Sequence, residues 1–201
     1  MIAFNDQSFF ESAPSLGGLV QHELEQFKLH QSHRWPVYLE ERKSFLAAIK
    51  GTDLSRAYLD VFKPRIAVFA GSFNPFHKGH YNVLQKAEKI FDKVIIAFGK
   101  NPEKDLRTWA RPRSVINRQI EEYDGLLTDF IASLNHEVVV VRGLRNSTDF
   151  QYEQNQYRYI QELMPGIRIV NIFCDKEFEH ISSSGIRTLE KFNKHQNYLL
   201  D

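Results

Sequence analysis

The stretch RIAVFAGSFNPFHKGH, residues 65 to 80, constrains the fold more than any other part of this 201-residue chain. Its apolar residues 66 to 70 precede a turn that holds two glycines, an asparagine and a proline, and a helical pattern follows. A buried strand that runs through a glycine-rich turn into a helix is the opening unit of a parallel α/β sheet. Such sheets bind ligands at this kind of turn, so we look there first for chemistry.

Three further segments have the composition of buried parallel strands. Residues 94 to 98 (VIIAF), 138 to 141 (VVVV) and 167 to 173 (IRIVNIF) are short, rich in β-branched residues and mostly apolar on both faces. We therefore expect all of them to be covered on both sides of the sheet.

Helical patterns alternate with these strands. Val83, Leu84, Ala87 and Phe91 fall on one face of a helix, and a second helix can run from Tyr152 to Met164 before Pro165-Gly166 ends it. The alternation predicts right-handed βαβ units, and hence an α/β fold with a Rossmann-like doubly wound parallel sheet.

Residues 1 to 62 follow a different pattern, in which no strand is evident. Pro36 can open a helix that places Leu39, Arg42, Leu46 and Ile49 on one face, and Gly51 can close it. We predict a helical N-terminal extension over residues 1–62, joined to the α/β domain of residues 63–201.

Composition limits the partners and the compartment. The net charge is +1, so no whole-protein field attracts nucleic acid or an anionic membrane. No stretch approaches the ~20 apolar residues of a membrane span, and the N-terminus lacks the pattern of a signal peptide. The single cysteine, Cys174, suits a reducing compartment and is most simply a buried strand residue. We predict a cytoplasmic protein that binds neither nucleic acid nor membranes.

The turn after the first strand suits a polyphosphate. Gly71 can let the backbone approach a phosphate, and Gly79 lets His77 and His80 lie in the first turn of the next helix, beside free amides. A Walker A loop is excluded because no G-K-[ST] sequence follows, and a dinucleotide fingerprint is excluded because the glycine spacing is wrong. The alternative is a plain tight turn with two surface histidines.

Two later clusters carry further phosphate-binding chemistry. Arg142 and Arg145 leave the end of a predicted strand, and Ser182 to Ser184 precede a predicted helix. The alternatives are that both arginines form structural salt bridges with Asp149 and Glu153, and that the serines are an ordinary helix cap.

The order of these motifs resembles that of a known family. HKGH (77 to 80) and ISSSGIR (181 to 187) match the HxGH and ISSSxxR signatures of the nucleotidyltransferase superfamily. VVRGLRNSTDFQYE (140 to 153) and Lys104, in NPEK, make the chain most similar to phosphopantetheine adenylyltransferases. Taken alone, Lys104 can also be a solvated loop lysine.

The resemblance implies that an acceptor phosphate attacks the α-phosphorus of ATP and that pyrophosphate leaves. The acceptor would be 4′-phosphopantetheine and the product dephospho-coenzyme A. His80 would hydrogen-bond the α-phosphate and Lys104 would neutralise the charge that develops, as the two catalytic residues. Magnesium would be carried mostly by ATP, because Mg²⁺ keeps its waters and needs few protein ligands. The family also implies a homo-oligomer.

The resemblance assigns the remaining site residues by position. The residues implied to bind ATP are Gly71, Ser72, Phe73, His77, Gly79, His80, Arg145, Glu153, Ser182, Ser183 and Ser184, and those implied to bind the acceptor are Ser72, Lys104 and Arg142.

The predicted acceptor region departs from the family pattern. Ile160 and Gln161 stand where an Asn-Arg pair is usual, and no strand is evident before the DGLL motif at 124 to 127. The segment after Lys104 instead carries Arg107, Trp109, Arg111 and Arg113, either as an exposed loop or as a site for a different acceptor.

Asn74 and His77 make the turn more like that of nicotinamide mononucleotide adenylyltransferases. Transfer to that or another phosphorylated acceptor therefore stays an alternative, as does a non-catalytic module that binds nucleotide or coenzyme A.

Overall fold

The computed structural model describes residues 25–28, 37–38, 40–42, 64–100 and 111–201. The chain divides into two units, Met1–Pro64 and Arg65–Asp201. In the first unit, residues 25–28, 37–38 and 40–42 are helical, and the rings of Phe27 and Tyr38 pack edge to face with centroids 5.1 Å apart. Leu39, Leu46, Ile49 and Gly51, which were expected to shape this helix, lie outside the described residues.

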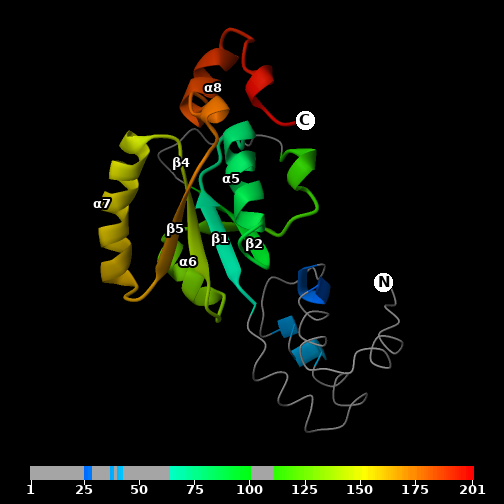
Figure 1. The fold of residues 1–201 in the computed structure, drawn as a ribbon, viewed down its shortest axis with the longest axis vertical. Helices are drawn as coiled ribbons and strands as arrows, with labels where there is room; N and C mark the ends of the chain where they lie inside the picture. The colour runs from blue at the N-terminus through cyan, green and yellow to red at the C-terminus, as the bar shows by residue number, and fades with distance from the viewer. Residues whose placement is uncertain (1–24, 29–36, 39, 43–63, 101–110) are drawn as a thin grey trace. The chain divides into compact units, whose positions relative to one another are not determined.

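The second unit is built on a five-stranded parallel sheet (Figure 1). Its strands are β1 (Ile66–Gly71), β2 (Lys93–Lys100), β3 (Ile120–Asp124), β4 (Val139–Leu144) and β5 (Arg168–Phe173). They lie in the order β3-β2-β1-β4-β5, and every neighbouring pair is parallel. The chain moves outward from β1 to β3 and then returns to the other side of β1, so the predicted Rossmann-like doubly wound sheet is confirmed.

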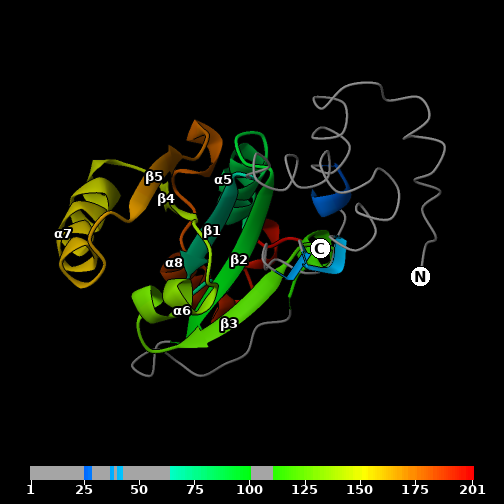
Figure 2. The same cartoon turned by 90° about the horizontal axis from the view of Figure 1, so that it is seen from below.

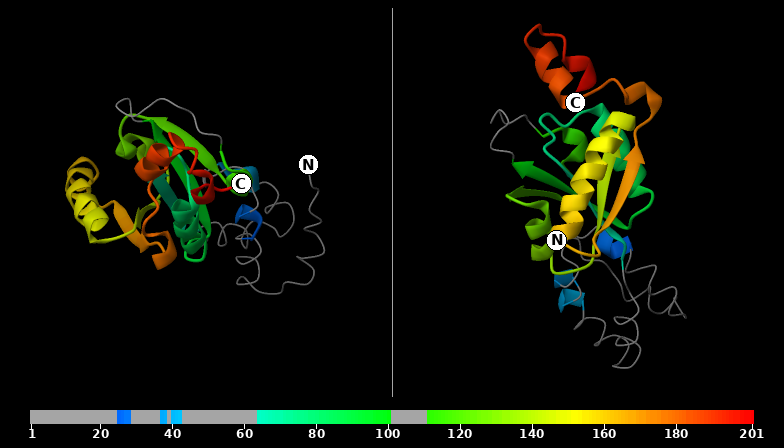
Figure 3. Two further views of the ribbon diagram at one scale, coloured as in Figure 1. Left: turned by 90° about the horizontal axis from the view of Figure 1, so that it is seen from above. Right: turned by 90° about the vertical axis from the view of Figure 1, so that its left-hand side faces the viewer.

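Helices cover both faces of the sheet. The helices of this unit are α5 (Lys78–Glu88), α6 (Leu127–Ser133), α7 (Ser147–Leu163) and α8 (Ser183–Glu190), with short 3₁₀ turns at Arg113–Val115, Lys176–Phe178 and Gln196–Tyr198. Figure 2 shows α5 on one face and α6 and α7 on the other. Helix α8 lies beyond the carboxyl ends of the strands (Figures 1 and 3). None of the described helices is long and apolar enough to cross a membrane.

The core lies between the central strands and α5. Residues 66 to 70 of β1 and 94 to 97 of β2 are buried, as the apolar composition of these strands predicts, whereas Phe98 is only half-buried. Val83, Leu84 and Ala87 form the buried face of α5, as predicted, and Phe91 is buried just after the helix ends.

The expectation that no strand precedes the DGLL motif is wrong. Residues 120 to 124 (IEEYD) form β3, which pairs with β2 so that Ile120 lies beside Ile96. Because β3 is an edge strand whose side chains are exposed or only half-buried, it tolerates Glu121 and Glu122 and lacks the apolar run of a central strand.

Three further expectations need correction. Strand β5 is also an edge strand, and it exposes Arg168, Asn171 and Phe173 where full cover was expected.

Helix α7 begins at Ser147, five residues before Tyr152, because the side chain of Asn146 accepts a hydrogen bond from the amide of residue 149 and caps it. Cys174 is buried, but it follows β5 and is not part of a strand.

Candidate active site

A cavity of about 510 Å³ opens at the carboxyl ends of β1 and β4. These are the neighbouring strands at which the order of the sheet reverses. Its wall is completed by the turn after β1, the start of α5, the first turns of α7 and the start of α8. Ligands of doubly wound sheets bind at this position, where no crossing connection fills the space between two strand ends.

Phe73 organises the turn after β1. Its backbone has a φ of 43°, and its ring packs against Phe69, Phe76 and Phe98 with centroids 4.9 to 5.1 Å away. A Cβ atom on Gly71 would lie 2.8 Å from Cε1 of this ring, closer than packed atoms approach. Gly71 is therefore required by the aromatic packing of the turn, whereas the sequence suggested only an approach to phosphate.

His77 and His80 cap the start of α5 reciprocally. Nδ1 of His77 accepts a hydrogen bond from the His80 amide at 3.4 Å, and Nδ1 of His80 accepts one from the His77 amide at 3.3 Å. The two rings stack with centroids 3.6 Å apart, and His77 is only 3% exposed. The alternative of two surface histidines is therefore wrong.

Both imidazoles are neutral at pH 7. Burial lowers the pKa of His77 to about 4, and the charge of Arg145 contributes. Burial also lowers the pKa of His80 well below its ordinary value, helped by His77 and Arg145. Because Nδ1 of each neutral ring accepts a hydrogen bond, its proton is on Nε2. His80 therefore offers a neutral Nε2–H donor.

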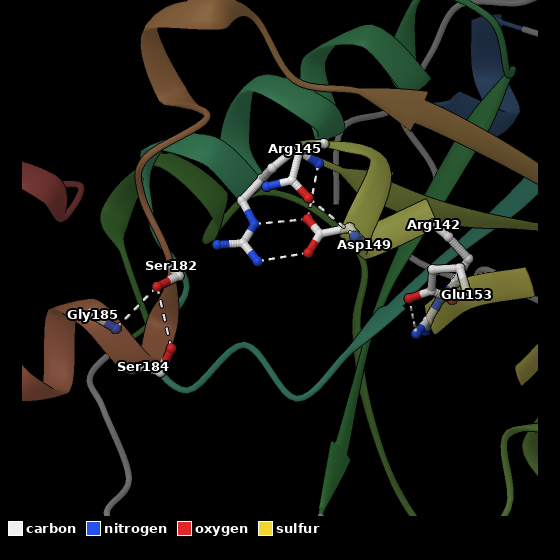
Figure 4. Close-up of polar contacts among 8 residues, drawn as sticks. Arg142, Arg145, Asp149, Glu153, Ser182, Ser184 and Gly185 are labelled. Atoms are coloured by element: carbon white, nitrogen blue, oxygen red, sulfur yellow. Dashed lines mark hydrogen bonds and ion pairs between the residues drawn. The ribbon is translucent and has the colours of Figure 1, made fainter. Parts of the chain in front are cut away.

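Arg142 and Arg145 are held by carboxylates of α7 (Figure 4). Nε and Nη2 of Arg142 both lie 2.7 Å from the Glu153 carboxylate, and Nη1 donates to the carbonyl of Ala70 at 2.9 Å. Nε and Nη2 of Arg145 lie 2.8 and 2.7 Å from the Asp149 carboxylate. The alternative that these residues form salt bridges is confirmed, yet all four also line the cavity.

The start of α8 is tied to the turn after β1. Ser183 Oγ donates to the carbonyl of Pro75 at 3.0 Å, and Arg187 Nη1 donates to the carbonyl of Asn74. Ser182 is the N-cap, whose Oγ accepts from the amide of residue 185 at 3.0 Å and lies 3.2 Å from the hydroxyl of Ser184 (Figure 4). The cap alternative is thus confirmed for Ser182, while the next two serines lie inside the helix.

The cavity brings together most of the residues that the sequence selected. The predicted residues in its wall are Gly71, Ser72, Phe73, His77, Gly79, His80, Arg142, Arg145, Glu153, Ser182, Ser183 and Ser184. Lys104 lies outside the described residues.

The sequence analysis did not select every residue in the wall. Arg187, Asp149 and Tyr152 also line the cavity. Arg187 ends the ISSSGIR motif, and Asp149 follows Arg145 by one helical turn. Both could therefore have been selected as site residues from the sequence.

The predicted acceptor region lies partly elsewhere. Ile160 faces a separate hollow of about 200 Å³ between α7 and β5, and Gln161 donates to the carbonyl of Ile167. Arg111 pairs with Glu122 and lies over the ring of Phe98, so contacts within the protein hold its side chain in place. Arg107 and Trp109 lie outside the described residues.

Among the described residues, no three His, Cys, Asp or Glu side chains are grouped so that they could hold a metal ion. The two carboxylates in the cavity wall, those of Asp149 and Glu153, are each occupied by an arginine.

The chain is similar to known proteins over the unit that holds the cavity. The model of the cytidylyltransferase-like family matches residues 68–189. The phosphopantetheine adenylyltransferase of Mycoplasma capricolum is 36% identical over 139 residues, which are 65% of this chain and 99% of that protein. The protein of the same name from Levilactobacillus brevis is 35% identical over 136 residues, 63% of this chain and 84% of that one.

A more remote similarity is to the solved structure of a bifunctional NMN adenylyltransferase/ADP ribose pyrophosphatase from Francisella tularensis. It is 18% identical with a TM-score of 0.45, and the match covers 68% of this chain and 44% of that one.

Proposed function

This chain belongs to the cytidylyltransferase-like family, and on that basis we propose that it transfers AMP from ATP to 4′-phosphopantetheine, giving dephospho-coenzyme A and pyrophosphate. The observation that carries the proposal is the 36% identity to a phosphopantetheine adenylyltransferase over nearly the whole length of that relative. The cavity at the ends of β1 and β4 supplies the chemistry that such a transfer needs.

The triphosphate of ATP binds between the turn after β1 and the start of α8. The amides and hydroxyls at the N-terminus of this helix favour an anion, because they lie at the positive end of the helix dipole. Arg145 adds a full positive charge, and its Nη1 is not used in the bidentate pair with Asp149. The N-terminus of α8 and Arg145 are thus proposed to bind the β- and γ-phosphates.

His80 acts at the α-phosphate. An oxygen of the acceptor phosphate forms a bond to the α-phosphorus, the bond from that phosphorus to the bridging oxygen breaks, and pyrophosphate leaves with the electron pair. Negative charge spreads over the non-bridging oxygens during this step, so a preorganised donor stabilises it. The neutral Nε2–H of His80 is such a donor. Lys104 is proposed to add positive charge at the same centre.

Arg142 is proposed to bind the phosphate of the acceptor. Glu153 and the carbonyl of Ala70 fix its guanidinium at the end of β4, and its remaining N–H groups are available to a phosphate. Ser72, in the turn beside it, also lines the cavity and is proposed to touch the same phosphate.

Magnesium is proposed to enter as the complex of ATP and to be held by phosphate oxygens and water. Mg²⁺ keeps several of its waters and is commonly carried by substrate phosphates. The pairing of both cavity carboxylates with arginines supports this assignment.

The alternative acceptor is nicotinamide mononucleotide, because Asn74 and His77 make the turn more like that of nicotinamide mononucleotide adenylyltransferases. The proposal further includes a cytoplasmic location, which the single cysteine suits. It also includes a homo-oligomer, which the resemblance to phosphopantetheine adenylyltransferases implies.

The test is to incubate the full chain with ATP and Mg²⁺ and to offer 4′-phosphopantetheine, nicotinamide mononucleotide or glycerol 3-phosphate separately. We expect pyrophosphate release with 4′-phosphopantetheine. Release only with another acceptor would overturn the substrate assignment. Binding of ATP without release in any mixture would instead indicate a nucleotide-binding module.

A further inference from the structure

The segment between β5 and α8, residues 174–182, lies against α5 before it reaches the serines of the cavity wall. The amide of residue 174 donates to the carbonyl of Leu144, and the 3₁₀ turn Lys176–Phe178 follows. Phe178 packs partly buried against the core, and a Cβ on Gly79 would lie 3.7 Å from the Cβ of Phe178. The segment therefore contacts the first turn of α5.

Two side chains of α5 hold Asp175 of this segment. Nδ2 of Asn82 donates to Oδ2 of Asp175 at 2.7 Å, and the amide of Asp175 donates to Oδ1 of Asn82 at 2.9 Å. Nζ of Lys86 lies 2.7 Å from Oδ1 of Asp175 and donates to the carbonyl of Phe173 at 2.7 Å. Hydrogen bonds from Lys86 and Asn82 lower the pKa of Asp175, so this carboxylate is charged at pH 7. We call Asn82, Lys86 and Asp175 the α5 clamp.

Asp175 does not stabilise the 3₁₀ turn that it precedes. It occupies the N-cap position of this turn, where an aspartate commonly accepts a hydrogen bond from the amides that follow. Its side chain makes no such bond, and both carboxylate oxygens contact α5 instead. The side chain of Asp175 therefore joins two elements of the fold.

We propose that Asn82, Lys86 and Asp175 are positioning residues, which fix the segment 174–182 on α5 and thereby set the position of the phosphate-binding start of α8 relative to the start of α5. The inference rests on the proposed function for its effect on ATP, because that function assigns the β- and γ-phosphates to the start of α8. The order of the segment itself can be measured without any substrate.

Backbone hydrogen bonds connect the α5 clamp to α8. The amide of Phe178 donates to the carbonyl of Asp175 at 2.9 Å, and the amide of Ile181 donates to the carbonyl of Phe178 at 3.0 Å. Ile181 is buried and directly precedes Ser182, the N-cap of α8. Because each bond starts from the residue that the preceding bond fixes, a displacement of Asp175 displaces the start of α8.

The start of α8 is attached in turn to the residues that lead into α5. Ser183 donates to the carbonyl of Pro75 at 3.0 Å. Arg187 donates to the carbonyl of Asn74. The α5 clamp thus closes a path that runs from α5 through the segment 174–182 to α8 and returns to α5 through the turn after β1. Both phosphate-binding helix starts lie on this path, so their separation depends on the clamp.

The test uses four variants of the full chain. Asn82→Ala removes both hydrogen bonds to Asp175, and Asn82→Asp places a second carboxylate against it. The double variant Asn82→Asp/Asp175→Asn exchanges the amide and the carboxylate, so that donors and acceptors match again. Glu88→Ala is the matched control, because Glu88 also lies on α5 and pairs with a basic side chain, that of Arg118, which does not belong to the segment 174–182.

The first readout is hydrogen exchange in the ligand-free proteins, measured by mass spectrometry of peptides that cover residues 174–187. We expect exchange to be about fivefold faster in Asn82→Ala and Asn82→Asp than in the native chain, the factor that corresponds to one net hydrogen bond. The double variant and Glu88→Ala should exchange as slowly as the native chain.

Kinetics separate positioning from a general loss of stability. KM for ATP should rise about fivefold in Asn82→Ala and Asn82→Asp, while KM for 4′-phosphopantetheine stays within about twofold of the native value. The acceptor should be spared because Arg142 and Glu153 belong to β4 and α7, which lie outside the closed path. The double variant should restore KM for ATP.

Native exchange rates in a folded Asn82→Ala variant would overturn the inference, as would a double variant no better than Asn82→Asp, or an equal rise in KM for both substrates. Should Asn82→Ala fail to fold, Asn82→Asp and the double variant provide the same comparison. If the native chain proves inactive with 4′-phosphopantetheine, the proposed function fails, while hydrogen exchange still decides the role of the α5 clamp.

Discussion

Acidification is expected to destabilise the α/β unit through His77, because this histidine is buried in its neutral form. Its pKa in the folded chain is about 4, below the value of about 6.5 of an exposed histidine. Between these values the unfolded chain binds a proton that the folded chain does not bind. The contribution of His77 to stability is therefore complete above about pH 6.5 and is lost as the pH falls toward 4.

The pKa difference sets the size of the effect. A difference of about 2.5 pKa units corresponds to about 3 kcal/mol in the free energy of unfolding, of which about 2 kcal/mol is lost by pH 5. That loss is large beside the total stability of roughly 5 to 15 kcal/mol that is usual for a domain. The pKa of His80 is lowered as well, so His80 adds to the loss in the same direction.

The assay is urea unfolding at pH 7.5, 6 and 5, followed by circular dichroism, for the native chain and for His77→Thr. Threonine can cap α5 but does not titrate. Between pH 7.5 and 5 the variant should therefore lose about 2 kcal/mol less stability than the native chain. Parallel losses in the two proteins would refute the reasoning, because they would show that His77 binds its proton equally well in the folded and the unfolded chain.

Three substitutions test the rest of the site. His80→Ala should lower kcat for pyrophosphate release about 10²–10³-fold, as loss of one preorganised donor does, while its circular dichroism spectrum stays native. Arg145→Lys keeps the charge but loses the bidentate pair with Asp149, so KM for ATP should rise about tenfold in the same assay. An unchanged KM would show that Arg145 does not bind ATP. Gly71→Ala places a Cβ 2.8 Å from the ring of Phe73, so it should lower the free energy of unfolding by about 1–3 kcal/mol in urea titrations. A variant as stable as the native chain would show that the turn can adjust to the added Cβ without cost.

The central strands and the place of the site were predictable from sequence for one physical reason. β1 and β2 are buried over most of their length, so their apolar runs report their surroundings directly. In a parallel sheet the carboxyl ends of the strands meet at one edge, which is why residues as distant as Gly71 and Arg145 were expected in one cavity.

The edge strand β3 was not predictable in the same way, whereas β5, at the other edge, was predicted as a strand but with too much burial. β3 pairs with β2 alone, and its sequence, IEEYD, combines a half-buried Glu121 with an exposed Glu122. Such a strand is held mainly by backbone hydrogen bonds, which any residue except proline can supply, so its side chains carry little signal.

The ion pairs show a different limit of prediction from sequence. The spacing of Arg145 and Asp149 is compatible with a salt bridge and also with a phosphate site, and the structure places the bonded pair in the cavity wall. A sequence cannot rank these alternatives, because one guanidinium can serve both. The tie from Arg187 to the carbonyl of Asn74 joins residues 113 positions apart and depends on tertiary packing alone. The catalytic role of Lys104 stays a prediction.

The most direct test of the account is the reverse reaction. The full chain is incubated with Mg²⁺, pyrophosphate and dephospho-coenzyme A, and ATP is measured by luciferase luminescence, with NAD in place of dephospho-coenzyme A in a parallel sample. The account predicts ATP from dephospho-coenzyme A, none from NAD, and little from either with His80→Ala. ATP from NAD alone, or ATP from dephospho-coenzyme A that His80→Ala leaves undiminished, would contradict it.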